Sequence, residues 1–247
     1  MLYSLIKSGF KTEYLILALL SVPVILFSLS FHELSHGYIA YKLGDDTAKR
    51  MGRLTLNPAK HLDPIGTLMM LFVGFGYAKP VPVNPYAFKN PKKGMALTAL
   101  AGPVSNLILS FISILILMIL NASSDIPLLY PETEYQLSWL VVLMTREKSF
   151  TIAQMLLVTL STLLLLFHTL NLSLAVFNLI PIPPLDGSRL LNIFLPEDVY
   201  FGIMKYERFI LIGLFLAISF LPFSPVSWVT DRISEGLQSL LGLIPGL

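Results

Sequence analysis

Four long stretches of the chain contain no charged residue, and this feature limits the possible folds most strongly. They cover residues 14–31, 95–120, 151–185 and 209–230. A helix needs about 20 apolar residues to cross the hydrocarbon core of a bilayer. Only 13% of all residues are charged, whereas soluble globular proteins carry about 25%. The sequence therefore predicts an integral, multi-pass membrane protein.

The predicted fold class is an all-α polytopic membrane protein with about four spanning helices. A three-helix core lies within residues 1–200, with spans over 14–40, 95–120 and 151–180. Residues 201–247 are expected to supply a C-terminal span and an interfacial segment. Two prolines, Pro222 and Pro225, should end the last spanning helix near Leu221, because proline cannot continue a helix.

Two apolar segments, residues 137–144 and 236–247, are too short to span a bilayer. The first is expected to lie on the surface, and the second is expected to be interfacial or packed against the spans.

The distribution of basic residues predicts the orientation in the membrane. Residues 41–94 hold nine Lys or Arg and three Asp, whereas residues 121–150 hold two Lys or Arg and four Asp or Glu. The positive-inside rule places the first of these loops in the cytoplasm. An alternative treats Lys7 and Lys11 as a signal peptide's basic region or as cytoplasmic residues, and the latter would reverse the orientation. A retained first span is preferred, because the apolar run is longer than a usual signal core.

The segment His32-Glu33-Leu34-Ser35-His36 directly follows the first uncharged run. Residues i and i+4 share one helix face, so both imidazoles can point at one ion. Glu33 can then reach a metal-bound water as general base, which is the division of labour in H-E-x-x-H hydrolases. The alternative is an ordinary solvated helix turn. Charged groups within a membrane helix cost about 2.5–3.5 kcal/mol each, so a zinc site is preferred.

A catalytic zinc needs a third protein ligand, and the chain has no cysteine. Asp186 is the best candidate, because prolines at positions 181, 183 and 184 fix the turn that presents it. The first and third spans are both expected to run from the outside to the cytoplasm, so Asp186 and His36 should lie at the same depth. An ordinary helix-exit turn is the alternative for Asp186. His168 lies in mid-span and is expected to form an interhelical hydrogen bond, with a proton relay as the alternative. One Zn²⁺ per chain is expected.

Three segments, in this order, resemble the motifs of the site-2 protease family of intramembrane zinc metalloproteases. They are His32-Glu33-Leu34-Ser35-His36-Gly37, Ala101-Gly102-Pro103-Val104-Ser105-Asn106 (similar to G-x-x-x-N) and Asn178-Leu179-Ile180-Pro181-Ile182-Pro183-Pro184-Leu185-Asp186-Gly187 (similar to N-x-x-P-x-P-x-L-D-G). The resemblance covers roughly residues 14–191. It implies a zinc-dependent endopeptidase that hydrolyses peptide bonds within or near transmembrane segments.

The resemblance also implies roles for individual residues. His32, His36 and Asp186 would ligate zinc, and Glu33 would be the general base. Asn106 and Asn178 would hold the scissile carbonyl or its oxyanion, where amide donors stabilise developing charge. The alternative for each Asn is an interhelical hydrogen bond.

Residues 74–85 resemble a family feature, a membrane-associated β-hairpin or loop beside the active site. Val81 and Val83 could line one face of a short strand there and bind an unwound substrate by strand addition. The preceding residues 57–64 are turn-rich, and His61 and Asp63 are expected to be structural.

The expected partners are the lipid bilayer and single-span membrane protein substrates. The active site is expected near the cytoplasmic side of a prokaryotic cell membrane. A net charge of +2 without a basic stripe argues against nucleic acid. The chain resembles the compact form of the family, without a PDZ or nucleotide-sensing domain, and its oligomeric state is left open.

Two other classes of protein fit parts of this sequence. A zinc transporter or channel would not need a glutamate next to a ligand, and it would favour polar residues strung along the spans, which the second and fourth spans lack at depth. An inactive relative acting as a scaffold would usually have lost a ligand or the glutamate.

Overall fold

Three long helices form the centre of the computed structural model, which describes residues 12–63, 66, 78–124, 151–220 and 225–244. They are α2 (Thr12–Lys42), α5 (Pro91–Ala122) and α7 (Ile152–Leu179). Each is long and apolar enough to cross a membrane, over Leu15–Lys42, Pro91–Ala122 and Ile152–Leu179. The structure thus confirms the predicted all-α architecture and its three-helix core, and each helix extends close to its predicted bounds.

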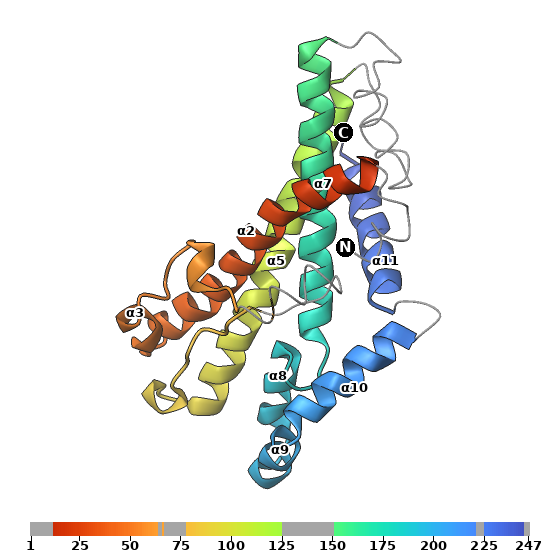
Figure 1. Cartoon of the computed structure of the whole chain (residues 1–247). Coiled ribbons are helices and arrows are strands. Elements are labelled where there is room, and N and C mark those ends of the chain that lie inside the picture. Colours follow the sequence, from red (N-terminus) through yellow and green to blue (C-terminus); the bar gives the residue numbers. More distant parts are fainter. Residues whose placement is uncertain (1–11, 64–65, 67–77, 125–150, 221–224, 245–247) are drawn as a thin grey trace.

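Helix α5 packs against both of the other long helices, and α2 also contacts α7 (Figure 1). Near its C-terminal end, Ile114 and Leu117 are completely buried in an apolar cluster. The opposite surfaces of the three helices stay apolar, with Leu19, Ile108 and Leu156 each about half exposed or more. Large exposed apolar surfaces of this kind are typical of contact with lipid.

Short elements gather at the N-terminal end of α5. The connection from α2 to α5 contains α3 (Thr47–Arg50), η1 (Pro58–Lys60) and η2 (Pro85–Ala87). After α7, the chain turns through residues 180–185 into α8 (Asp186–Phe194) and α9 (Glu197–Met204). Helix α8 packs against α5 and α7, so the third motif is brought back onto the core.

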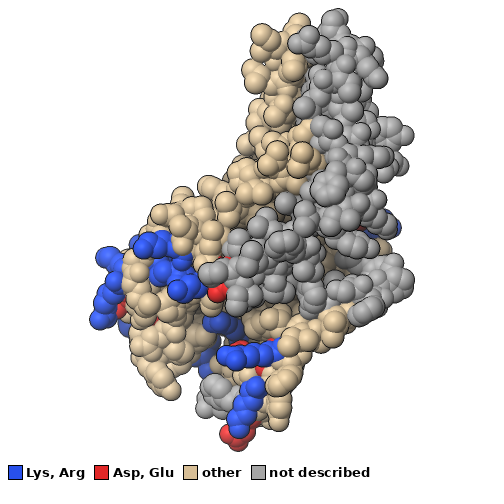
Figure 2. All heavy atoms as spheres, viewed as in Figure 1, with Lys and Arg blue, Asp and Glu red and all other residues tan. Residues whose placement is uncertain are grey.

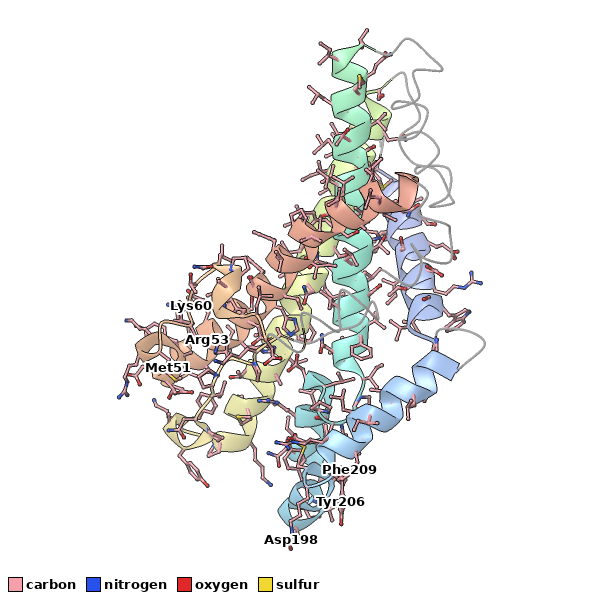
Figure 3. All side chains as sticks on the ribbon, viewed as in Figure 1. Met51, Arg53, Lys60, Asp198, Tyr206 and Phe209 are labelled. Carbon is pink, nitrogen blue, oxygen red and sulfur yellow. The ribbon has the colours of Figure 1, made fainter. Side chains whose placement is uncertain are left out.

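The C-terminal part differs from the prediction of a fourth continuous span. Helix α10 (Glu207–Phe220) has 14 residues, fewer than the roughly 20 that a span requires. The predicted helix end near Leu221 stays a prediction, because residues 221–224 lie outside the described part of the chain. Helix α11 (Pro225–Leu241) then packs along α7 (Figure 1). Figure 3 labels Tyr206 and Phe209, which are exposed at the start of α10.

His168 connects three helices, as predicted for an interhelical hydrogen-bonding residue. Its Nδ1 lies 2.8 Å from Ser110 Oγ on α5, and its Nε2 lies 2.8 Å from Ser234 Oγ on α11. Leu241, within the segment predicted to be interfacial or packed, is buried against the core. The other short apolar segment, residues 137–144, lies outside the described residues.

The predicted β-hairpin at residues 74–85 is not confirmed. The described residues of this region contain a single isolated antiparallel bridge, between Leu62 and Ala78, and no strand. Pro80 and Pro82 lack the amide hydrogen that a ladder uses, so this segment could pair along one edge only. Residues 67–77 lie outside the described part of the chain.

Candidate metal centre

Three predicted ligands converge at one point. His32 and His36 lie one turn apart on α2, and Asp186 is the first residue of α8. The two imidazole Nε2 atoms are 3.0 Å apart. Asp186 Oδ2 lies 3.1 Å from His32 Nε2 and 3.2 Å from His36 Nε2. Both histidines are buried, and these three residues form a group that could hold a metal ion.

This triangle fits a zinc ion in size and chemistry. Zinc bonds to His nitrogen and carboxylate oxygen are about 2.0–2.2 Å long in a tetrahedral arrangement, which places ligand atoms about 3.3 Å apart. The three observed separations of 3.0–3.2 Å are within a few tenths of an ångström of that value. Glu33, next to His32, is not part of the group and is left for another role.

Gly102 on α5 lies directly against the two imidazoles. A Cβ atom at this position would be 2.4 Å from His36 Nε2 and 2.6 Å from His32 Nε2. Any side chain here would therefore displace the ligand atoms, and glycine keeps the space beside them open.

The charge of Asp186 suits a metal ligand. Burial by itself would raise the pKa of its carboxyl group, but His36 and His32 beside it hold that pKa well below its usual range. Asp186 is therefore ionised at neutral pH, which is the form that binds a metal.

Hydrogen bonds fix the orientation of both imidazoles. His36 Nδ1 lies 2.7 Å from the backbone oxygen of Thr98. A carbonyl oxygen can only accept, so Nδ1 carries the proton and Nε2 presents its lone pair to the metal site. His32 Nδ1 lies 2.5 Å from Asn106 Oδ1. An amide oxygen also only accepts, so His32 likewise carries its proton on Nδ1.

The two predicted carbonyl-holding asparagines have different surroundings. Asn106 is completely buried, and its Nδ2 donates to Asn171 Oδ1 at 2.7 Å. Its amide is thus engaged by His32 on one side and by Asn171 on the other. Asn178 lies in the last turn of α7, where its Nδ2 donates to Leu174 O at 2.9 Å. Contact of either residue with a substrate stays a prediction.

Glu33 contacts the segment that was predicted to bind substrate. Its carboxylate is buried, and Oε2 accepts a hydrogen bond of 2.9 Å from the backbone N–H of Val81. Val81 is buried, whereas Val83 is partly exposed. The structure therefore brings Val81 next to the predicted general base, and the role of both valines toward substrate stays a prediction.

Side chains from the preceding connection hold both ends of residues 79–84. Arg53, labelled in Figure 3, donates from Nη2 to Lys79 O at 2.7 Å. Asp45 is almost completely buried, and its Oδ2 accepts from Asn84 N at 2.7 Å. This segment is thus attached to the end of α2 and to the loop after α3.

His61 and Asp63 have the structural roles that were predicted. His61 Nε2 donates to Thr55 O at 2.7 Å, and its backbone oxygen accepts from Lys79 N. Asp63 Oδ1 accepts from Gly66 N. Neither residue is a member of the metal-binding group.

Several residues of the site had not been identified from the sequence. They are Asn171 and Ser28, which extend the hydrogen bonds of Asn106, and Thr98, whose carbonyl orients His36. A usable signal existed for the first two, because polar residues inside apolar spans often mark function.

Comparison with known proteins agrees with this geometry. The sequence profile of peptidase family M50 matches residues 20–220. A Bacillus subtilis (strain 168) protein named as a zinc metalloprotease, YwhC, is 39% identical over 227 residues, covering 92% of this chain and 91% of its own. The similarly named Rip2 of Mycobacterium tuberculosis (strain ATCC 25618 / H37Rv) is 27% identical over 83% of this chain and 71% of its own. No solved structure matches the chain significantly. The chain therefore belongs to peptidase family M50, the site-2 protease family, and is a zinc metalloprotease.

Proposed function

We propose that the protein is an intramembrane endopeptidase, which hydrolyses peptide bonds within or near transmembrane segments of membrane proteins. The observation that carries this proposal is the place of the site in the fold. His32, Glu33 and His36 are buried on a helix that is long and apolar enough to span a membrane. Two further apolar helices of spanning length pack around this site, so a substrate would reach it from within the bilayer.

The proposed chemistry divides the work between the metal and this chain's residues. One zinc ion per chain, held by His32, His36 and Asp186, would lower the pKa of a water molecule to about 7 and polarise the substrate carbonyl. Glu33 would act as the general base at Oε1, taking a proton from the attacking water and passing it to the leaving amine. The Val81 N–H, bonded to Oε2, keeps the carboxylate aligned for both transfers.

Substrate contacts are proposed for Asn178 and for the segment around Val81 and Val83. The Asn178 amide has two N–H groups, of which Leu174 O accepts one, and the second could hold the scissile carbonyl. Prolines flank Val81, and the Val81 N–H already donates to Glu33, so within residues 80–83 the Val83 N–H is the one proposed for a substrate backbone. A peptide bond in a transmembrane helix is already internally hydrogen-bonded, and the substrate must unwind before it can lie along this segment.

The proposed orientation places the active site near the cytoplasmic side of a prokaryotic membrane. Figure 2 shows Lys and Arg side chains gathered at one end of the molecule, around α3 and near α8 and α9. The metal ligands come from the C-terminal half of α2 and from the start of α8, close to that end. The positive-inside rule then supports a cytoplasmic location, and single-span membrane proteins are the proposed substrates.

The substitution Glu33→Gln tests the proposed mechanism. Glutamine keeps the size of the side chain and an oxygen for the Val81 N–H, but it cannot take a proton. Cleavage of a transmembrane reporter by purified protein in liposomes should fall about 100- to 10,000-fold, with the bound zinc unchanged. Glu235→Gln is the matched control, since Glu235 is exposed on α11 and paired with Arg232, and it should cleave normally. Persistent cleavage by the Glu33 variant would disprove the role of this base.

A further inference from the structure

A chain of hydrogen bonds between buried polar side chains leads from α7 through α5 to α2. Its members, Asn171, Asn106, Ser28 and His32, are all buried, the first three completely. Polar groups are costly to bury inside a membrane protein unless they are hydrogen-bonded. Three such groups directly behind one metal ligand therefore call for an explanation beyond packing.

The donor and acceptor in each of these hydrogen bonds follow from one backbone carbonyl whose role is certain. Asn171 Nδ2 lies 2.8 Å from Phe167 O, a backbone carbonyl that can only accept. The same Nδ2 donates to Ser28 Oγ at 2.9 Å. Asn171 must therefore turn its oxygen toward Asn106, whose Nδ2 donates to it at 2.7 Å.

This arrangement determines the tautomer of His32. Since Asn106 uses its nitrogen for Asn171, its Oδ1 faces His32 Nδ1 at 2.5 Å. An amide oxygen only accepts, so Nδ1 carries the proton, and the lone pair of Nε2 points to His36 and Asp186. His36 needs no such relay, because the backbone carbonyl of Thr98 orients it and cannot rotate.

We propose that Asn171 is a positioning residue that acts through Asn106 to keep the proton of His32 on Nδ1 and Nε2 ready to bind the metal. The inference rests on the proposed zinc ligation by His32. Without Asn171, the Asn106 amide is able to turn over and donate an N–H to Nδ1. That orientation favours the tautomer with its proton on Nε2, which cannot bind a metal through this atom.

The first experiment measures the zinc affinity of purified full-length protein in detergent, with Zn²⁺ titrated against a competing chelator. Asn171→Ala is expected to weaken zinc binding about 10- to 100-fold, as typically seen when a group that orients a ligand is lost. The matched control is Ser110→Ala. Ser110 is one turn after Asn106 and also bonds α7, through His168, but it is not connected to His32. This control should bind zinc as the unmodified protein does.

A double substitution separates positioning from general damage to the fold. In Asn106→Asp, both carboxylate oxygens accept, so His32 Nδ1 keeps its acceptor whichever way the group is turned. With Asn171 still present, however, its Oδ1 faces a carboxylate oxygen and repels it. Asn106→Asp alone should therefore bind zinc more weakly, and Asn106→Asp combined with Asn171→Ala should recover to within about threefold of the unmodified protein.

Each outcome decides between clear alternatives. Recovery in the double variant supports the proposal, because general damage would add up in it. Unchanged affinity in Asn171→Ala, or a double variant no better than Asn106→Asp, overturns it, and the second comparison holds even if Asn171→Ala does not fold. An unmodified protein that binds no zinc would instead overturn the proposed function itself.

Discussion

Gly102 matters to the metal site through the side chain that it lacks. The ligands predicted from spacing, His32 and His36, are one turn apart on α2, and α5 approaches them at this glycine. The distance between the helices is thus set by the absence of a Cβ atom at one position.

Gly102→Ala should abolish zinc binding. The added Cβ would lie within 2.4–2.6 Å of three atoms of His32 and His36, so the imidazoles must move out of the ligand triangle. We expect at least about a 100-fold loss of zinc affinity, together with loss of proteolysis. The matched control is Gly213→Ala on α10, where an added Cβ has open space around it. Retained zinc binding in the Gly102 variant would show that α5 can shift away without harm.

At the scale of residues, the sequence predicts the ligands better than the groups that orient them. His32 and His36 were identified by their H-E-x-x-H spacing, and Asp186 by the long motif that contains it. Asn171 stands out only as a polar residue in an apolar span, because its partner Asn106 lies 65 positions earlier in the chain and no local pattern indicates that pairing.

The segment 79–84 shows how an element without regular secondary structure can still be held in place. Its backbone is fixed by Arg53 at one end and by Asp45 at the other, and between them Val81 bonds Glu33. Side chains thus hold this segment in place, whereas a β-strand would be held by backbone hydrogen bonds to a neighbouring strand.

Loosening this segment should reduce catalysis without affecting the metal. In Asp45→Ala, the N–H groups of Asn84 and Thr47 lose their acceptor, and hydrogen bonds to a charged group contribute about 1.5–3 kcal/mol. We expect kcat/KM for a transmembrane reporter to fall about tenfold, with zinc content unchanged. Asp46→Ala is the matched control, since Asp46 is exposed and paired with Arg50. Equal rates in both variants would contradict a role for this attachment.

At the scale of elements, the sequence predicts the long helices well and the connection between α2 and α5 poorly. Uncharged apolar runs of spanning length leave a helix as the only stable structure in a bilayer, which is why α2, α5 and α7 were found. The predicted hairpin had no such constraint. Its proline-rich backbone is shaped by Asp45 and Arg53, which are distant in sequence.

In the whole molecule, the metal site connects α2 to α8, the helix that follows the third long helix. Its ligands come from α2 and α8, which are more than 140 positions apart in the sequence. Helix α5 packs beside both and contributes Gly102 and Asn106 to the same site. Bound zinc should therefore stabilise the arrangement of three helices, because it binds the folded state and not the separated elements.

Removal of zinc should lower the thermal stability of the protein in detergent. At a free zinc concentration 100 times the dissociation constant, binding stabilises the folded state by about 2.7 kcal/mol, and about 2–4 °C of Tm corresponds to each kcal/mol for a chain of this size. A strong chelator should thus lower Tm by about 5–10 °C, and added Zn²⁺ should restore it. Asp186→Ala, which lacks one ligand, should have a lower Tm that no longer responds to the chelator. If both proteins responded equally, the zinc that stabilises the fold would be bound elsewhere than between α2 and α8.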